Sequence, residues 1–504
     1  MRNGTGVMIS GPPSEQVGSN LPGSRFPKKQ PPTAGDSAPR PGKPPGFASK
    51  VISLAWPASV EQLIGNSIVF ADILFLARLG SDAIAGVGIC ATLIFAFVAI
   101  FNAVAIAATT VVAQAKGAGA PGLLEKGAAQ SILLAVALGV VSGSAGVLLA
   151  RPTMQLMGAV GAVEDYGVAY MRPVLLASPL YAFALTGGGI LRGTGDTRTP
   201  MVFTLISNAL KIVLSGLLVF GKAGFPCMGV KGAALATVVC YGVNAALLGT
   251  KLSRGFGPVR LRLRAFLPDP GLLKRIMRLA LPVGGELMIM RAGFIFYMRM
   301  VSALGTIALA ANQIAMRLES ISLSIAFGFT AAATTLVGQA VGRRNLADAA
   351  RNVVATARLS LISMCSMTVV LILVRHWAVD MFAPEAAVRG PAIVCLVIAA
   401  FELIPLGFIF TFAGALRGAG DTRSPMIVAI VGTFIFRLPL VYLLGVRSGL
   451  GLPGIWYGTI LDWIGRSIVI YLIYRTGAWK ARAFIAQPCP PGVEALESEA
   501  TCRE

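Results

Sequence analysis

The chain has 504 residues, of which 55% are hydrophobic and 13% are charged. So much apolar surface argues against a water-soluble protein with a single core and favours a membrane protein. A net charge of +21 would suggest a nucleic-acid partner, but the basic residues lie mostly between hydrophobic runs and no RNA-recognition, zinc-finger or helix-turn-helix signature is present. The single His376 and the lack of a CxxC motif argue against a metal site or a Ser-His-Asp triad.

The first 50 residues are rich in Pro, Gly, Ser and Lys, which predicts a disordered tail. This segment has no apolar stretch of the kind found in a signal peptide, so the first membrane helix should itself direct insertion. A start codon assigned too far upstream is the alternative explanation.

Apolar segments long enough to cross a hydrocarbon layer of about 30 Å recur from residue 51 onward and predict membrane-spanning α-helices. Three prolines (Pro179, Pro405 and Pro439) fall inside them and should kink the helices. Twelve spans are predicted: 52–77, 86–111, 129–150, 167–190, 201–221, 232–251, 279–303, 310–337, 357–375, 391–415, 426–446 and 454–474.

The positive charges orient these spans. If both tails are cytoplasmic, roughly 29 of the 43 Lys and Arg lie on the inner side and about 7 lie outside. We therefore expect an all-α membrane protein with twelve transmembrane helices in two six-helix lobes. The predicted parts are a disordered cytoplasmic tail (1–50), an N-terminal lobe (51–252), a basic cytoplasmic linker (253–278), a C-terminal lobe (279–475) and a cytoplasmic tail (476–504).

The two lobes are copies of one unit, because a shift of 225 residues lays the second half on the first. The segment 107–117 (AATTVVAQAKG) meets 332–342 (AATTLVGQAVG), and 191–201 (LRGTGDTRTPM) meets 416–426 (LRGAGDTRSPM). Generic apolar composition cannot supply such polar matches. An even number of crossings per unit gives a parallel repeat, whose central cleft is a natural place for a transported substrate.

The repeated Arg-Gly-x-Gly-Asp-Thr-Arg-x-Pro segments are predicted to be turns between helices 4 and 5 and between helices 10 and 11. Their glycines permit a tight turn, and Asp196 or Asp421 can cap the next helix or pair with an arginine. A structural or gating role is the first interpretation, and direct contact with an ion or substrate is the alternative. The charged residues concerned are Arg192, Asp196 and Arg198, with Arg417, Asp421 and Arg423 in the second copy.

With these paired turns, the Val337-Gly-Gln339 segment and the Leu304-Gly-Thr306 turn, residues 51–475 resemble the multidrug and toxic compound extrusion (MATE) family. The family belongs to the multidrug, oligosaccharidyl-lipid and polysaccharide exporter superfamily. The resemblance implies a two-lobed antiporter that expels amphipathic, often cationic compounds against inward flow of H⁺ or Na⁺.

The resemblance also assigns residues. Asp72 matches the acidic residue of helix 1 through which MATE proteins couple to a cation. In helix 5 the family often has an Asn followed four residues later by an Asp, and here Lys211 and Ser215 stand at those positions. This departure puts the coupling site of the N-terminal lobe in doubt.

Buried charges within a bilayer cost about 2.5 to 3.5 kcal/mol each on insertion scales, so they normally pair or mark function. We hypothesise that the Lys211 ammonium pairs with Asp72, which would disfavour Na⁺ relative to H⁺ at this place. A permanent structural ion pair is the alternative.

The second lobe holds further intramembrane charges. Asp462 and Arg466 have the i,i+4 spacing of a helical ion pair. Glu61 and Glu286 are repeat-related, which favours a shared scaffold role, whereas Glu402 meets Ala177 and is a candidate for the substrate site. The candidates for coupling-ion or substrate binding are Asp72, Asn208, Lys211, Ser215, Glu286, Arg299, Glu402 and Asp462.

The predicted function is secondary active antiport of drugs or other organic compounds by alternating access, in the bacterial inner membrane. We expect the lipid bilayer and small organic substrates as partners, a monomer, no nucleic acid, and no metal or cofactor beyond H⁺ or Na⁺ as coupling ion. Export of a lipid-linked precursor or polysaccharide is the alternative within the same superfamily. A membrane enzyme is disfavoured because the sequence has no HExxH, nucleotide-binding loop or nucleophile elbow.

Overall fold

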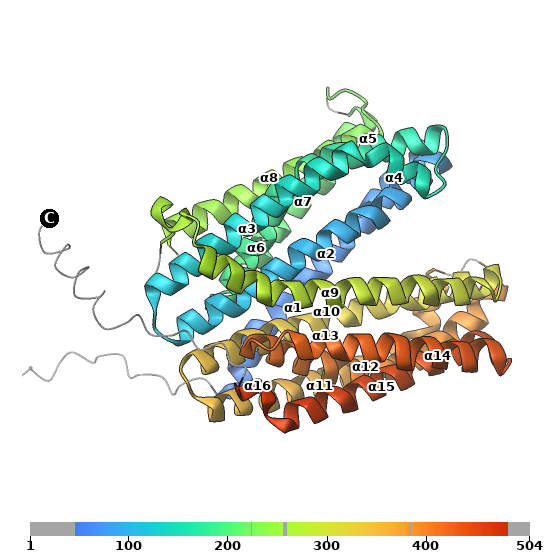
Figure 1. The fold of residues 1–504 in the computed structure, drawn as a ribbon. Coiled ribbons are helices and arrows are strands. Elements are labelled where there is room, and N and C mark those ends of the chain that lie inside the picture. The colour runs from blue at the N-terminus through green and yellow to red at the C-terminus, as the bar shows by residue number, and fades with distance from the viewer. Residues whose placement is uncertain (1–45, 223, 256–259, 383–384, 482–504) are drawn as a thin grey trace, which may run out of the picture. The chain divides into compact units, whose positions relative to one another are not determined.

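The computed structural model describes residues 46–222, 224–255, 260–382 and 385–481, without the side chains of 67–74, 263 and 481. Every regular element in these ranges is helical (Figure 1). The first half contains α1 (Phe47–Leu76), η1 (Ala77–Leu79), α2 (Ser81–Gly117), α3 (Pro121–Leu148), α4 (Ala150–Leu156), α5 (Ala162–Leu176), α6 (Ser178–Thr194), α7 (Arg198–Phe220) and α8 (Val230–Arg254).

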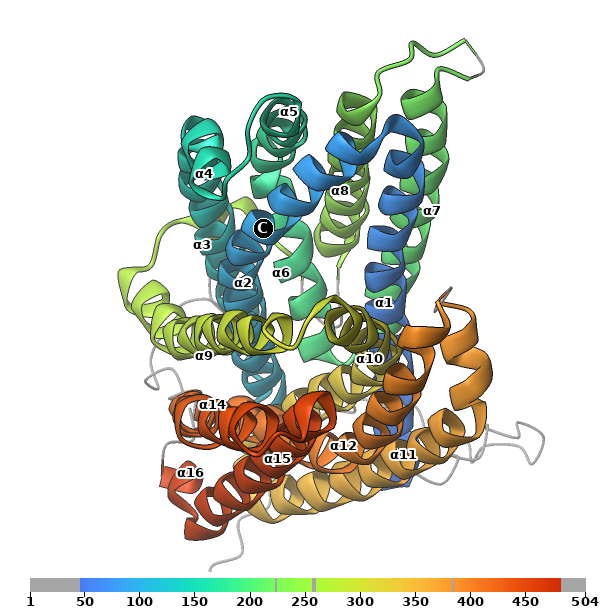
Figure 2. The same ribbon diagram turned by 90° about the vertical axis from the view of Figure 1, so that its right-hand side faces the viewer.

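The second half follows a short connector that contains η2 (Leu263–Phe266). It consists of α9 (Pro270–Ser302), α10 (Thr306–Gly342), α11 (Leu346–Asp380), α12 (Ala386–Ala419), α13 (Arg423–Ile430), η3 (Val431–Arg437), α14 (Leu438–Val441), η4 (Tyr442–Arg447), α15 (Gly451–Thr476) and α16 (Ala478–Ala481). Figure 2 shows α9 between the two groups, where it packs on α2 of the first half and α13 of the second.

The predicted all-helical membrane fold is confirmed. Each of the twelve predicted spans coincides with one helix or with a run of consecutive helical pieces. Within the described ranges, nine helices are long and apolar enough to cross a bilayer, and ten if the bent pair α5–α6 counts as one span. The helices α1 and α15 account for the other two predicted spans. The protein is therefore a multi-pass membrane protein.

Two of the three intramembrane prolines lie where the helical backbone is irregular. Pro179 is in the first turn of α6, and α5 and α6 meet at an angle of 54°. Pro439 lies between the two π-helical segments η3 and η4, as expected for a residue that lacks an N–H group and crowds the preceding turn. Pro405 lies within the uninterrupted helix α12.

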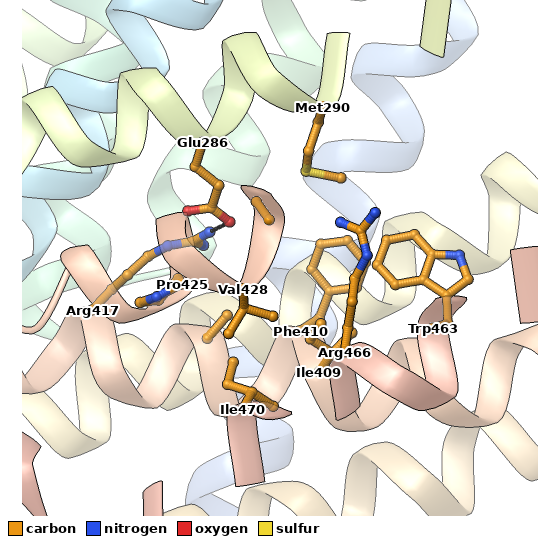
Figure 3. A pocket seen from close by; sticks show the side chains of 12 residues that line it. Glu286, Met290, Ile409, Phe410, Arg417, Pro425, Val428, Trp463, Arg466 and Ile470 are labelled. Atoms are coloured by element: carbon orange, nitrogen blue, oxygen red, sulfur yellow. Dashed lines mark hydrogen bonds and ion pairs between the residues drawn. The ribbon is translucent and has the colours of Figure 1, made fainter. Parts of the chain in front are cut away.

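The wide turn of η3 brings the backbone against α15. A Cβ atom at Gly432 would lie 2.1 Å from Nε of Arg466, so only glycine leaves room for this guanidinium. Arg466 and Trp463 lie side by side on α15 and face the interior of the second half (Figure 3).

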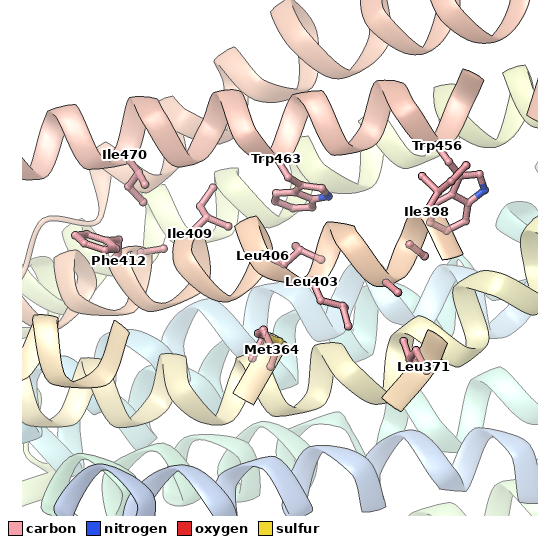
Figure 4. Close-up of a cluster of buried hydrophobic side chains, with 14 of the residues drawn as sticks. Met364, Leu371, Ile398, Leu403, Leu406, Ile409, Phe412, Trp456, Trp463 and Ile470 are labelled. Carbon is pink, nitrogen blue, oxygen red and sulfur yellow. The ribbon is translucent and has the colours of Figure 1, made fainter. Parts of the chain in front are cut away.

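The two halves differ in how their interiors are filled. Buried apolar side chains of the second half form one continuous cluster across α10, α11, α12 and α15 (Figure 4). Met364, Leu403 and Trp456 are fully or almost fully enclosed in it. In the first half the buried apolar residues divide into separate clusters.

Glycines allow the closest helix pairs of each half to approach. A Cβ atom at Gly189 would lie 2.6 Å from the carbonyl oxygen of Ala105, and one at Gly414 would lie 2.5 Å from that of Thr330. These two glycines are related by the 225-residue shift, so α2–α6 and α10–α12 use the same small-residue packing.

We predict that Gly414→Ala destabilises the fold by about 1 to 3 kcal/mol, because the added methyl meets backbone that no rotamer change can move away. The measurement is the midpoint of thermal unfolding in detergent. Gly242→Ala is the matched control, since this helical glycine has open space around its Cβ position. Equal midpoints for the two variants would show that the close approach is not a packing constraint.

Candidate functional site

The helices α6 and α12 end in the two repeated turns with the same backbone geometry. Gly195 and Gly420 follow them with φ of +90° and +95°, a left-handed conformation that favours glycine. In the residue that follows, the backbone N–H of Asp196 donates to the carbonyl oxygen of Leu191 at 2.9 Å. The backbone N–H of Asp421 donates to the carbonyl oxygen of Leu416 at the same distance. The shared glycine spacing therefore produces one turn type twice.

The aspartates of these turns stabilise the start of the following helix. Asp196 accepts hydrogen bonds from the backbone N–H and hydroxyl of Thr199 at 3.0 and 2.6 Å. Asp421 accepts from the backbone N–H and hydroxyl of Ser424 at 3.1 and 2.7 Å. The side-chain cap expected from the sequence is thus present in both copies.

A helix leaves its last four carbonyl groups without intrahelical partners. In this protein each half supplies partners for the other. Thr335 of α10 donates to the carbonyl oxygen of Arg192 at 2.9 Å, and Gln339 donates to that of Gly193 at 3.0 Å. The repeat-related bonds run the opposite way, from Thr110 to the carbonyl oxygen of Arg417 at 3.1 Å and from Gln114 to that of Gly418 at 2.8 Å. We call these four bonds the reciprocal caps.

The reciprocal caps lie where α2 and α10 approach most closely. A Cβ atom at Gly117 would lie 2.1 Å from the carbonyl oxygen of Gln339, and one at Gly342 the same distance from that of Gln114. Near the start of α1, the Thr197 hydroxyl donates to the carbonyl oxygen of Ser53 at 3.5 Å. The turns, the caps and the start of α1 therefore share one end of the protein, hereafter the turn end, where the halves are in tight contact.

Two repeat-related ion pairs lie beside the reciprocal caps. Arg192 pairs with Glu61 at 2.8 Å, with both side chains about one-sixth exposed. Arg417 pairs with Glu286 at 2.5 Å (Figure 3), with side chains only 8% and 9% exposed. The glutamates on α1 and α9 thus hold the arginines at the ends of α6 and α12. This geometry fits the scaffold role expected for Glu61 and Glu286.

The first half encloses a cavity of about 410 Å³. It lies inside this half rather than between the halves, because its lining comes from α1, α2, α5, α6, α7 and α8. Its wall is mostly apolar and aromatic, with the rings of Tyr181 and Tyr241 4.7 Å apart. Polar groups also line it, among them Thr237 and Asn244. A mostly apolar pocket with a few polar groups is typical of a site for a small organic ligand.

Two of the candidates on α7 line this cavity. Asn208 and Lys211 are buried there, and the Cys240 thiol contacts the Asn208 side-chain oxygen at 3.5 Å. Ser215 is also buried, but its hydroxyl has no hydrogen-bond partner among the described residues. The backbone of Asp72 belongs to α1, and its side chain lies outside the described residues, so the predicted pair with Lys211 stays a prediction.

The second half contains a buried charged cluster on η3 and α15. Asp462 is fully buried and accepts from Arg466 at 2.7 Å, as its i,i+4 spacing predicted, and from Arg437 of η3 at 2.8 Å. Both guanidinium groups lie over the Trp463 ring, 4.7 and 4.8 Å from its centroid. Asp462 is thus held by Arg466 of its own helix and by Arg437 of the neighbouring helical segment.

Glu402 lies next to this group on α12 and is 4% exposed. It accepts a hydrogen bond from the Thr459 hydroxyl at 2.9 Å. Glu319 of α10 is also buried, with 7% of its surface exposed. Nearby, the Tyr297 hydroxyl donates to Asn312 at 2.8 Å.

Other candidates lie apart from these sites. The side chains of Arg198 and Arg423 are exposed at the first residues of α7 and α13, and Arg299 is exposed on α9. Sequence reasoning did not select Glu319 or the cavity tyrosines as site residues. The signal for Glu319 was present, because it is an acidic residue within an apolar segment. The tyrosines carry no such signal, since an aromatic residue in a membrane helix is ordinary.

We predict that Glu286→Gln is more damaging than Glu61→Gln. Removing Glu286 leaves the Arg417 charge buried without its partner, which costs about 3 to 5 kcal/mol for such pairs, whereas Arg192 is more exposed to solvent. The yield of monodisperse protein and its thermal midpoint in detergent measure the difference. Equal losses in the two variants would contradict the unequal burial of the pairs.

Known proteins resemble the whole two-half arrangement. The profile of the MatE family matches residues 57–217 and 282–443, one stretch in each half. The chain is 30% identical over 446 residues to "Probable multidrug resistance protein NorM" of Thermotoga maritima, covering 88% of this chain and 95% of the relative. A protein of the same name from Rhodopseudomonas palustris is 28% identical over 418 residues, 80% of this chain and 86% of that relative.

Solved structures share the fold. A crystal structure described as MATE in complex with MaL6 superposes with a TM-score of 0.82 over 87% of this chain and 98% of its own. The two sequences are 22% identical, so this similarity concerns the fold alone.

Proposed function

The chain belongs to the MatE family, and from this premise we propose that it exports amphipathic, often cationic drugs or other organic compounds by antiport. The observation that carries the proposal is the set of reciprocal caps. They close the turn end with four bonds that are related by the repeat and involve no ionised side chain.

Such bonds suit alternating access. Each is worth about 0.5 to 1.5 kcal/mol net, because water replaces it when the halves separate. The contact is therefore specific in geometry but modest in energy. If the halves separate at the turn end and come into contact at the opposite end, the interior opens first to one side of the membrane and then to the other.

The cavity of the first half is the proposed substrate site. Its volume of about 410 Å³ is in the range of pockets for drug-sized ligands, and its wall combines aromatic rings with a few polar groups. Aromatic walls suit planar amphipathic compounds of varied structure. Two relatives are named as probable multidrug resistance proteins, which supports organic compounds as the substrate class.

We place the turn end on the cytoplasmic side of a bacterial inner membrane, with both termini on that side and the protein acting as a monomer. Basic residues lie there, including Lys116, Arg343 and Arg344 next to the reciprocal caps. Cytoplasmic loops carry the excess of Lys and Arg in membrane proteins. The described conformation then has its cytoplasmic end closed.

We propose H⁺ rather than Na⁺ as the coupling ion. Lys211 lies on α7, which packs on the helix α1 that carries Asp72. At that carboxylate its ammonium disfavours a small desolvated Na⁺ more than a bulky organic cation in the cavity, whose charge can lie further from Lys211. A proton needs no shell of oxygen ligands and can be carried by a single carboxyl group.

We predict that collapse of the pH gradient slows efflux of ethidium and norfloxacin from proteoliposomes at least tenfold, whereas collapse of the Na⁺ gradient leaves it within twofold. Protein-free vesicles are the control for leak. Retention of every drug under all gradients would argue against multidrug export, and flipping of a lipid-linked precursor would then be assayed on the same preparation.

A further inference from the structure

One position of the repeated unit reaches across to the other half in both copies. The 225-residue shift relates Asn66 of α1 to Arg291 of α9. Asn66 donates to the Ser324 hydroxyl of α10 at 3.1 Å. Arg291 places its guanidinium 5.0 Å from the centroid of the Phe95 ring on α2. The same position therefore makes a neutral hydrogen bond between the halves in one copy and a cation–π interaction in the other.

Arg291 has no counter-ion among the described residues. It stands at the midpoint of the predicted span 279–303, where a charged side chain is costly and normally marks function. None of the ion pairs in the described part of the chain includes it. Its side chain is exposed, and the guanidinium lies over the face of the Phe95 ring. An aromatic ring thus takes the place that a carboxylate would otherwise fill.

Phe95 belongs to the wall of the cavity in the first half. It is 41% exposed, so part of the ring is accessible to a ligand. The repeat has Ser320 at this position of the second half, which offers no ring. Arg291 therefore brings a positive charge of the second half onto the wall of the cavity, and the repeat supplies no equivalent of this contact.

The ring face that Arg291 covers is also a place for an organic cation. A guanidinium and the charged group of a ligand are attracted to such a face by the same ring electrostatics, and the two cations repel each other. Lys211 lines the cavity from a different helix, α7, so a ligand with its charge over Phe95 need not lie beside that ammonium. Arg291 thus competes with a cationic ligand for Phe95, whereas a neutral ligand of the same shape meets no such competition.

We propose that Arg291 is a specificity-determining residue of the cavity, and that an organic cation binds at Phe95 by displacing its guanidinium. The role of Arg291 rests on the proposed function, because it takes the cavity as the substrate site. Arg291 belongs to the second half and Phe95 to the first, so a bound cation replaces a contact between the halves by a contact with the substrate. A neutral compound leaves the contact between the halves in place.

Equilibrium binding to the full-length protein in lipid nanodiscs tests this competition, with empty nanodiscs as the control for partition into lipid. The probes are ethidium, a planar cation, and dihydroethidium, its neutral reduced form, under anaerobic conditions. Arg291→Gln should lower the Kd of ethidium about two- to fivefold, as expected of one cation–π interaction at an exposed site. The Kd of dihydroethidium should stay within about 1.5-fold of wild type, since this ligand brings no charge to the ring.

Two further variants support the comparison. Arg299→Gln removes another exposed arginine of α9 and should change neither Kd. Arg291→Met keeps an apolar stem in place of the arginine, and it gives the same test if Arg291→Gln fails to fold.

Phe95 separates competition for the ring from general charge repulsion. If Arg291 acted only by repelling cations, Arg291→Gln would strengthen ethidium binding equally in a Phe95→Leu background. We expect most of the gain to vanish there, because the contested ring is gone. An equal gain for both dyes, or the full ethidium gain in the Phe95→Leu background, would overturn the proposal.

The same measurements distinguish a wrong role for Arg291 from a wrong function. If the wild type binds ethidium but Arg291→Gln leaves its Kd unchanged, the cavity stands as a cation site and the role of Arg291 is wrong. If the folded wild type binds neither dye, the cavity is not the substrate site, and the role of Arg291 is contradicted together with it.

Discussion

The contact between the halves depends on a property of every α-helix, the unpaired carbonyl groups at its C-terminus. The helices α6 and α12 end at buried positions, which water does not reach while the halves are in contact. The amides of the turns bond some of them, and across the halves Thr335 and Gln339 donate to the carbonyl oxygens of Arg192 and Gly193 in α6, as Thr110 and Gln114 do to those of Arg417 and Gly418 in α12. Each half therefore both donates to the other and accepts from it: the Thr and Gln side chains of α2 or α10 are the donors, and the carbonyl groups near the ends of α12 or α6 are the acceptors.

This arrangement explains why the frame of the protein is symmetric although its interiors are not. The glycines, the capping aspartates and the Glu–Arg pairs all serve the turn end, where a change in one copy would have to be matched in the other. Away from the turn end, residues of one half need not match those of the other. The first half leaves a cavity lined by Lys211 and aromatic rings, whereas the second half holds one continuous apolar cluster and the buried acidic residues Glu319, Glu402 and Asp462.

Much of the fold follows from the sequence. The helical spans follow from the length of the apolar runs, and the caps of Asp196 and Asp421 follow from local turn chemistry. The Asp462–Arg466 pair follows from helical periodicity, because both partners lie on one helix. Such features depend on neighbours along the chain, which a sequence shows directly.

Features that depend on helix packing could not be predicted from the sequence. Arg437 reaches Asp462 from another helix, through a π-helical segment that has no simple sequence pattern. Glu61 and Glu286 were recognised as repeat-related, but their partners Arg192 and Arg417 lie 131 positions away. The cavity of the first half arises from the way six helices pack, and no single residue in the sequence predicts it.

The central claim, that the reciprocal caps hold the turn end closed, is tested most directly by pulsed electron spin resonance between labels at Lys126 of α3 and Ala347 of α11, two exposed sites in opposite halves. In lipid nanodiscs, the wild type should show a population at the short distance, and Gln114→Leu or Gln339→Leu should each shift part of it to a longer distance by a similar amount. The similarity is expected because each variant removes one repeat-related bond. An unchanged distance distribution in both variants would contradict the claim.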